Sequence, residues 1–355
     1  MTTATPTAAP QLTDIDQLPT PAELRAQIPV EGARAAAVET ARTEIRDILA
    51  GRDDRLLVIA GPCSIHDVDA ALEYADRLAR LAEQHRDSLV VAMRVYLEKP
   101  RSTGGWTGLV PDPDLDGSGR FADGLALGRG LIADVADRGL AVGAEFLDPF
   151  LPAYLADGIA WGAIGARTTE SQVHRQLVSG LPMPVGFKNG TSGDVQLALD
   201  AATVAAQSHR VLVPGDDGRV QLRQTPGNPD GHVILRGGAA GPNFDSDTVH
   251  RAAEASARSG RSAGVIVDAS HGNSGKDHVR QAVVAGKLAG QIRQGDPIAG
   301  VMLESFLLPG RQDLPADGRT GLVRGMSVTD ACLGWAETER LVGALAMAQA
   351  ARAAR

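Results

Sequence analysis

Eight short apolar runs recur along the chain, separated by longer polar or alanine-rich segments. The first run, Leu56–Ala60, contains no polar residue, which is typical of a parallel strand buried on both faces. The seven later runs cover residues 89–94, 141–145, 160–165, 184–187, 232–235, 264–268 and 299–304. The pattern therefore predicts eight buried strands.

Helical patterns fill the intervals between these runs. We expect helices over residues 67–86, 121–138, 193–207, 245–259, 276–294 and 337–352. Two further helices are expected before the first strand, one beginning at Pro21 behind a Thr20 cap and one over about 32–50. A Gly- and Asp-rich turn over 215–218 separates the runs 210–213 and 220–223, and this arrangement predicts an inserted β-hairpin.

The alternation of eight strands with helices over about 300 residues is the signature of an α/β fold, the (β/α)8 TIM barrel. A doubly wound open sheet is the main alternative, but the strand count and the absence of G-x-G-x-x-G after the first strand favour the barrel. We expect a flexible tail over residues 1–19, an N-terminal extension over 20–52 and the barrel over 53–355. The extension is either a solvated appendage or an intersubunit or regulatory element.

The composition argues against several classes of protein. A net charge of −8 and an aromatic content of 3% disfavour a nucleic-acid-binding surface. No apolar run approaches the roughly 18 residues of a membrane span. The first residues lack a signal-peptide pattern, and only two cysteines, Cys63 and Cys332, occur in 355 residues. A reducing cytoplasm is the expected location.

Cationic residues follow the predicted strands, at the end where a barrel places its active site. They are Arg94, Lys99, Arg101, Arg167, Lys188 and Arg236. Few acidic residues share these positions, so the cations would repel one another strongly without a counter-charge. We therefore expect an anionic ligand, and two phosphorylated compounds fit best.

Four candidate metal ligands also fall at strand ends or in the loop after the last strand. They are Cys63, His271, Glu304 and Asp330. Each alone has an ordinary structural explanation, such as a core cysteine or a helix cap. A barrel would bring all four to one face, and a thiolate, an imidazole and two carboxylates suit a divalent transition metal. The long loop over 305–336 carries Asp330 and is expected to form an active-site flap.

Seven motifs together resemble one known family. They are Gly61-Pro62-Cys63-Ser64, the segment from Arg94 to Arg101, the segment from Gly162 to Gln172, Gly186-Phe187-Lys188-Asn189-Gly190, Leu235-Arg236-Gly237-Gly238, Asp268-Ala269-Ser270-His271, and Ser327-Val328-Thr329-Asp330-Ala331-Cys332. In this order they resemble the type I 3-deoxy-D-arabino-heptulosonate 7-phosphate (DAHP) synthases, in the branch regulated by aromatic amino acids. The resemblance covers residues 20–350.

The resemblance implies an enzyme that condenses phosphoenolpyruvate with erythrose 4-phosphate, the first step of the shikimate pathway. The extension and the hairpin suggest self-association, and a homodimer or homotetramer is expected. The same resemblance implies one divalent metal ion, bound by Cys63, His271, Glu304 and Asp330. The mixed ligand set admits Mn, Fe, Co or Zn. No nucleic acid and no membrane are expected as partners.

The resemblance also implies roles in substrate binding and catalysis. The phosphoenolpyruvate group is expected to comprise Arg94, Ala166, Arg167, Lys188 and Arg236, and the erythrose 4-phosphate group Lys99, Arg101 and Ser102. The catalytic group would be Lys99, Glu145, Lys188 and His271. Within it, Lys99 would protonate the aldehyde oxygen and Glu145 would manage a water.

Some readings stay open. Ser102 stands where the family usually has Thr, and the segments Pro152-Ala153, Leu181-Pro182 and 216–223 differ from feedback-sensitive members. Inhibition by Tyr, Phe or Trp is therefore an open hypothesis. The alternatives to the proposed reaction are a synthase that uses arabinose 5-phosphate, a Schiff-base aldolase with Lys188 as nucleophile, and a non-catalytic effector sensor on the same barrel.

Overall fold

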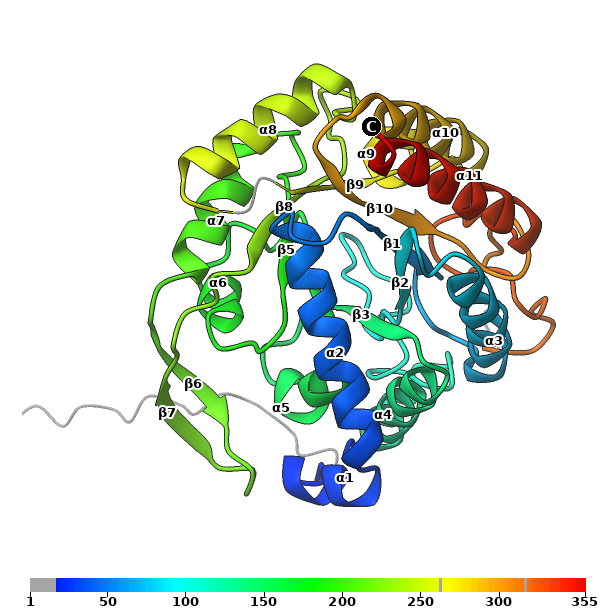
Figure 1. Ribbon diagram of the computed structural model, residues 1–355. Coiled ribbons are helices and arrows are strands. Elements are labelled where there is room, and N and C mark those ends of the chain that lie inside the picture. The colour runs from blue at the N-terminus through cyan, green and yellow to red at the C-terminus, as the bar shows by residue number, and fades with distance from the viewer. Residues whose placement is uncertain (1–16, 262–263, 316–317) are drawn as a thin grey trace, which may run out of the picture.

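Eight parallel strands close into a barrel in the computed structural model, which describes residues 17–261, 264–315 and 318–355 (Figure 1). Around the barrel the strands are β1 (Leu56–Gly61), β2 (Leu89–Arg94), β3 (Ala141–Glu145), β4 (Trp161–Ile164), β5 (Val185–Lys188), β8 (Gly231–Leu235), β9 (Val265–Asp268) and β10 (Ile298–Glu304). β10 pairs back onto β1 in parallel register. The predicted TIM barrel is confirmed, and the doubly wound open sheet is wrong.

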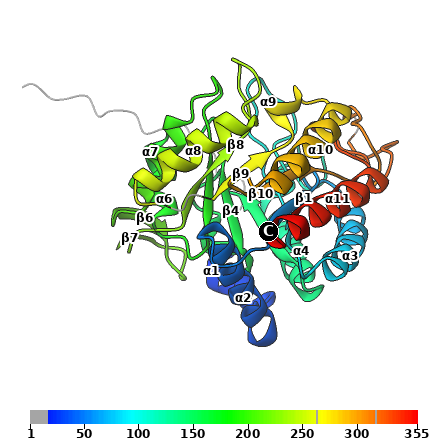
Figure 2. The same cartoon turned by 45° about the horizontal axis from the view of Figure 1, so that its top comes forward.

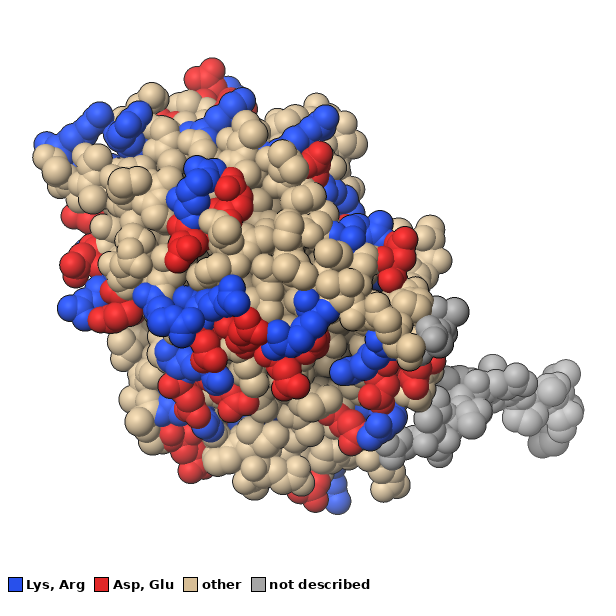
Figure 3. Space-filling view, turned by 90° about the vertical axis from the view of Figure 1, so that its right-hand side faces the viewer, with Lys and Arg blue, Asp and Glu red and all other residues tan. Residues whose placement is uncertain are grey.

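Helices pack around the outside of the barrel. The longer ones are α3 (Val68–Gln84), α4 (Phe121–Asp137), α7 (Gln196–Ala205), α8 (Ser246–Arg258), α10 (His278–Gln294) and α11 (Trp335–Ala353). All six lie within a few residues of their predicted bounds. On the side that carries α3 and α11, basic and acidic side chains are interspersed (Figure 3). Ion pairs within these helices, such as Arg77–Glu73 and Arg340–Glu337, belong to this pattern.

Several short helices were not predicted. They are α5 (Pro152–Leu155), the 3-10 turn η1 (Ala156–Gly158), α6 (Gln172–Val178) and α9 (His271–Ser274). The longest of them has seven residues, which is too few for a recurring apolar face. They form because the barrel holds both of their ends, and their sequences alone carry little helical signal.

The N-terminal extension packs against the barrel. Helix α2 (Gly32–Leu49) joins the apolar cluster inside the barrel through Ile45, Ile48 and Leu49. It lies at one end of the barrel, whereas α9 lies at the other end (Figure 2). The solvated-appendage alternative is therefore wrong. An intersubunit or regulatory role stays a prediction.

The predicted β-hairpin is confirmed as β6 (Arg210–Pro214) and β7 (Val220–Gln224). Helix α1 (Pro21–Gln27) of the N-terminal extension contacts the turn of this hairpin. The amide of Ala22 donates to the carbonyl of Asp216 at 3.1 Å. The predicted Thr20 cap is present, since Thr20 Oγ1 accepts from the Glu23 amide at 3.2 Å, and the Thr20 amide in turn donates to Glu23 Oε2 at 2.8 Å to complete a capping box.

The three-part division of the chain stays a prediction, and residues 1–16 of the expected tail lie outside the described residues. Among the helices that are described, none has the length and apolar character needed to cross a membrane.

Candidate active site

A charged cavity of about 270 Å³ opens at the carboxyl ends of the strands. Its cationic lining consists of Arg94, Lys99, Arg101, Arg167, Lys188, Arg236 and Lys276. All six predicted cations are thus brought together, and Lys276 joins them unpredicted. Ser102 and Ala166 also line the cavity. Three acidic residues stand among the cations: Glu145 and Asp330, which were predicted, and Glu98, which was not.

The loops around this cavity pack closely because of one glycine. Gly61 ends β1, and a Cβ built on it would lie 2.8 Å from the carbonyl oxygen of Arg94. That approach is shorter than real Cβ contacts allow, so only glycine lets the turn containing Cys63 pack against the end of β2. A backbone hydrogen bond also joins the two segments, because the Ile65 amide donates to the Tyr96 carbonyl at 2.9 Å.

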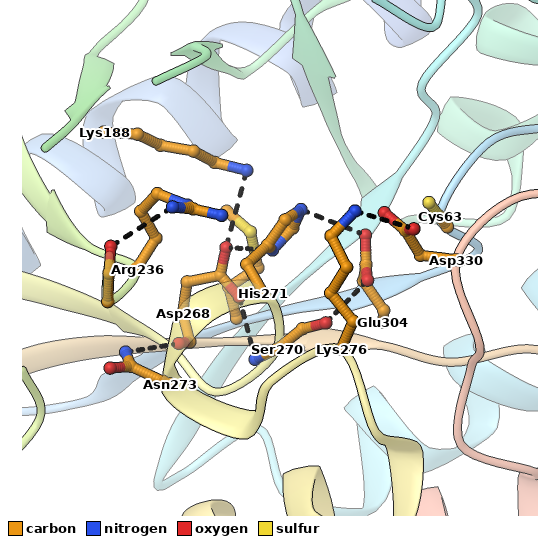
Figure 4. A network of polar contacts seen from close by, with 12 residues as sticks. Cys63, Lys188, Arg236, Asp268, Ser270, His271, Asn273, Lys276, Glu304 and Asp330 are labelled. Atoms are coloured by element: carbon orange, nitrogen blue, oxygen red, sulfur yellow. Dashed lines mark hydrogen bonds and ion pairs between the residues drawn. The ribbon is translucent and has the colours of Figure 1, made fainter. Parts of the chain in front are cut away.

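Three of the four predicted metal ligands form one compact group. A ligand atom from each of Cys63, Glu304 and Asp330 lies within 4.8 Å of the other two. His271 stands beside the group, with Nε2 3.5 Å from Glu304 Oε1 (Figure 4). Lys99 Nζ approaches the same group, at 2.8 Å from Cys63 Sγ and 3.3 Å from Asp330 Oδ2.

A further set of buried residues holds these side chains in place. Ser270 Oγ donates to Glu304 Oε2 at 2.6 Å, and Gln281 bonds both backbone groups of Glu304. Asp268 Oδ2 lies 2.8 Å from His271 Nδ1 and 3.4 Å from Lys188 Nζ. A carboxylate beside one ring nitrogen fixes the orientation of an imidazole whose other nitrogen faces a ligand site.

Two carboxylates of the site, those of Asp268 and Asp330, have pKa values below their usual range. Burial alone would raise the pKa of Asp268, but His271 and Lys188 hold it well below its usual range. Burial opposes ionisation of Asp330 as well, yet Lys99 and Lys276 lower its pKa. The site therefore combines negative ligands with a ring of positive groups, which is a suitable arrangement for an ion and an anionic substrate together.

Lys99 and Glu98 are neighbours with different electrostatics. Burial alone would lower the pKa of Lys99, but Cys63, Glu304 and Asp330 raise it above its usual value, so the side chain is an ammonium. Burial raises the pKa of Glu98 to about 7. The Glu98 carboxylate accepts from the amides of Leu147 and Asp148 and so ties the loop after β2 to the loop after β3.

Sequence reasoning missed several residues of the site: Tyr96, Glu98, Asp268, Ser270, Lys276 and Gln281. Asp268 is the last residue of β9, so the strand-end argument that found Glu304 applies to it equally. Lys276 is one of only four lysines, which is a weak signal. Nothing in the local sequence marks Gln281, because its role depends on a contact between α10 and β10.

Comparison with known proteins decides the family. A model of the DAHP synthetase I family matches residues 27–342. The chain belongs to this family. It is 49% identical over 338 residues to a phospho-2-dehydro-3-deoxyheptonate aldolase of Corynebacterium glutamicum, covering 94% of this chain and 92% of that protein. It is 48% identical over 332 residues to the Tyr-sensitive enzyme of Escherichia coli, with 93% of each chain covered.

A solved structure agrees with the assignment. The phospho-2-dehydro-3-deoxyheptonate aldolase of Francisella tularensis superimposes with a TM-score of 0.93 at 44% identity, covering 96% of this chain and 99% of that one. A Trp-sensitive enzyme of Escherichia coli is 49% identical over 335 residues, with 94% and 95% of the two chains covered. The resemblance found in the sequence is confirmed for the family and for its aromatic-amino-acid-regulated branch. The roles of individual residues stay predictions.

Proposed function

We propose that this chain condenses phosphoenolpyruvate with erythrose 4-phosphate to give DAHP and inorganic phosphate. Family membership supports this reaction. The main structural observation in its favour is the cavity lined by seven cationic side chains. Both substrates carry a phosphate, and phosphoenolpyruvate adds a carboxylate. Arginine binds such groups through two parallel hydrogen bonds, and lysine supplies a point charge.

A divalent transition metal fits the residues present. The thiol of Cys63 and the carboxylates of Glu304 and Asp330 converge within 4.8 Å, and the His271 imidazole adjoins them. These four would hold the ion, and the mixed sulfur, nitrogen and oxygen set suits Mn, Fe, Co or Zn. When bound, the ion would supply Lewis acidity toward an aldehyde oxygen.

The cationic residues prepare the reactants. Arg94, Arg167, Lys188 and Arg236 would bind the carboxylate and phosphate of phosphoenolpyruvate, while Arg101 and Ser102 would bind the aldose phosphate. Because these groups are held before the reaction begins, the reacting carbons meet in a fixed geometry. The lining of one cavity by both sets supports this assignment.

Proton movements fall to Lys99 and Glu145. The enol C3 of phosphoenolpyruvate attacks the aldehyde carbon, and the Lys99 ammonium donates its proton to the aldehyde oxygen. Water adds to C2, with Glu145 receiving its proton. The resulting hemiketal phosphate expels inorganic phosphate by C–O cleavage, and its hydroxyl proton passes to the departing phosphate as the C2 carbonyl forms. Glu145 Oε2 lies 3.8 Å from Lys188 Nζ, and this distance supports a role for Glu145 beside phosphoenolpyruvate.

A Schiff-base aldolase with Lys188 as nucleophile fits less well. The Lys188 ammonium is paired with Asp268 at 3.4 Å and Glu145 at 3.8 Å, whereas a nucleophilic lysine must be a free amine. Borohydride trapping of a substrate on Lys188 would support this rival. A synthase for arabinose 5-phosphate is tested by exchanging the aldose in the assay below.

The decisive assay measures phosphate release with both substrates, with and without a chelator. We expect release with erythrose 4-phosphate, its loss on chelation and its return with a divalent metal. No release from a folded protein given both substrates and metal would contradict the proposal. Phosphate release that survives chelation would contradict the proposed metal dependence. A preference for arabinose 5-phosphate would contradict erythrose 4-phosphate as the aldose substrate.

Feedback regulation is a separate hypothesis, supported by the Tyr-sensitive and Trp-sensitive relatives. Initial rates with Tyr, Phe and Trp at saturating substrates test it, and three flat curves would remove it. The homodimer or homotetramer also stays a prediction, which light scattering of the purified protein tests.

A further inference from the structure

Tyr96 separates the apolar core of the barrel from the charged cavity above it. The residue follows β2 and is only 3% exposed. It belongs to the interior apolar cluster together with Ile59, Trp161 and Met302. It also lines the cavity that holds the cations. The aromatic ring is therefore part of the floor of the site.

The guanidinium of Arg94 lies on this ring. Arg94 is 1% exposed, and its Cζ is 3.8 Å from the ring centroid of Tyr96. Its contact with a carboxylate is a single long one, from Nη2 to Glu304 Oε1 at 3.3 Å. Other contacts go to Met302 Sδ at 2.8 Å and to the carbonyl of Pro62 at 3.4 Å. No bidentate carboxylate holds this buried arginine within the described chain.

The same ring lies near a second cation. Lys188 Nζ is 5.9 Å from the Tyr96 centroid, inside the roughly 6 Å range of cation–π attraction. One neutral ring thus underlies cations from β2 and β5. A ring attracts both cations without cancelling their charge, whereas a carboxylate in its place would pair with them and compete with an anionic ligand.

The phenol hydroxyl has no part in this arrangement. Tyr96 Oη is buried and has no hydrogen-bond partner among the described residues. Burial raises the pKa of the phenol above its usual value, with Arg94 opposing the shift. The buried hydroxyl of Tyr74 differs, because it donates to Ser305 Oγ at 3.0 Å. An unpaired buried hydroxyl destabilises a fold, and a paired one does not.

We propose that Tyr96 is a positioning residue whose ring holds Arg94 and Lys188 in place for the carboxylate and phosphate of an anionic substrate. The inference rests on the proposed function in taking phosphoenolpyruvate as that substrate. It assigns the effect to the aromatic face and none to the hydroxyl. Tyr96→Phe keeps the face, whereas Tyr96→Leu and Tyr96→Met remove it while leaving an apolar side chain.

The test measures phosphoenolpyruvate binding by calorimetry and both KM values by phosphate release. In Tyr96→Leu, we expect the Kd and KM for phosphoenolpyruvate to rise about 30-fold, the factor that corresponds to a desolvated cation–π contact of about 2 kcal/mol. The KM for erythrose 4-phosphate should change less than about threefold. Tyr96→Met should behave like Tyr96→Leu and guards against a folding defect in either variant.

Tyrosine-to-phenylalanine variants distinguish the effect of the aromatic ring from that of the hydroxyl. Tyr96→Phe should keep the phosphoenolpyruvate constants within about threefold and raise the Tm of the ligand-free protein by about 2–4 °C, because it removes an unpaired buried hydroxyl. Tyr74→Phe, the matched control, should lower the Tm and leave both KM values unchanged.

Two results would overturn the inference. One is unchanged phosphoenolpyruvate binding in folded Tyr96→Leu and Tyr96→Met. The other is equal weakening in Tyr96→Phe, which would assign the effect to the hydroxyl. Because calorimetry reports binding without turnover, a wild-type protein that binds phosphoenolpyruvate but releases no phosphate would contradict the proposed function and leave this inference testable.

Discussion

At the N-terminal end of the barrel, a hydrogen-bonded pair of polar side chains lies in the interior. Trp161 Nε1 donates to His232 Nε2 at 3.1 Å, and His232 Nδ1 lies 3.0 Å from the carbonyl of Asp230. Burial lowers the pKa of this imidazole to about 4, so it is neutral. At the C-terminal end, buried residues such as Asp268, Glu304 and Arg94 are charged, and Tyr96 Oη has no partner within the described chain.

The difference shows that one end of the barrel serves the stability of the fold and the other serves ligand binding. At the end covered by α2, the buried side chains of Trp161 and His232 satisfy each other's polar atoms and so stabilise the fold. The end that opens to the cavity keeps charged side chains that the protein alone does not fully neutralise, and an anionic ligand can pair with them. Substitutions at the two ends should therefore affect different measurements.

The largest expected effect is at the open end. Lys99→Met should lower kcat by about 10²–10⁴-fold, because it removes the proton donor to the aldehyde oxygen. The Tm should stay within about 3 °C of the wild-type value, since the division of tasks predicts loss of activity without loss of fold. Lys287→Met, on the outer face of α10, is the control and should retain full activity. A kcat reduced less than about tenfold in Lys99→Met would contradict the role.

The next effect concerns metal affinity. Ser270→Ala removes the hydroxyl that donates to Glu304 Oε2 and should weaken binding of a divalent metal about 10–100-fold, as loss of supporting hydrogen bonds does at other sites. Titration of the metal-free protein with Mn²⁺ measures this. An unchanged Mn²⁺ affinity would show that Ser270 does not orient the ligand.

At the closed end, acid should destabilise the fold through His232. Its folded pKa of about 4 lies below the usual 6.5, so the unfolded chain takes up the proton first and stability falls as pH drops from about 6.5 toward 4. Between pH 7.5 and 5 this contributes about 2 kcal/mol. Denaturant unfolding of His232→Gln should lose that much less than wild type over the same range, and an equal loss would contradict the neutral-imidazole account.

The smallest effect should have the opposite pH dependence. The folded pKa of Glu98, about 7, lies above its usual 4.5, so the folded state holds the proton more tightly and stability falls as pH rises from about 4.5 to 7. Glu98→Gln should be more stable than wild type by about 1–2 kcal/mol at pH 5.5 and equal to it near pH 4. A variant less stable than wild type at pH 8 would show that the ionised carboxylate contributes more than its burial costs.

The features that the sequence predicted correctly are those that a local pattern of residues determines. The eight strands were predicted because each is buried on both faces and reads as an apolar run, as β1 does. The cations and Cys63 were found because the end of a parallel strand fixes where the next residue lies. The six cations and three of the four predicted metal ligands do meet as expected.

The remaining features depend on contacts between distant segments. Helix α6 has no periodic face of its own, and the short helix α9 forms where the turn after β9 packs. The stacking of Arg94 on Tyr96 and the pairing of Gln281 with Glu304 arise from side-chain directions that the linear pattern does not encode. Sequence therefore predicted which groups gather at the open end, but not which neighbours hold them.

The most direct test of the account is a crystal structure of the protein with Mn²⁺ and phosphoenolpyruvate, using anomalous scattering to locate the metal. We predict one anomalous peak within about 2.0–2.4 Å of ligand atoms from Cys63, His271, Glu304 and Asp330, with phosphoenolpyruvate against Arg94 and Lys188. A metal bound elsewhere, or a substrate carboxylate away from these two cations, would contradict it.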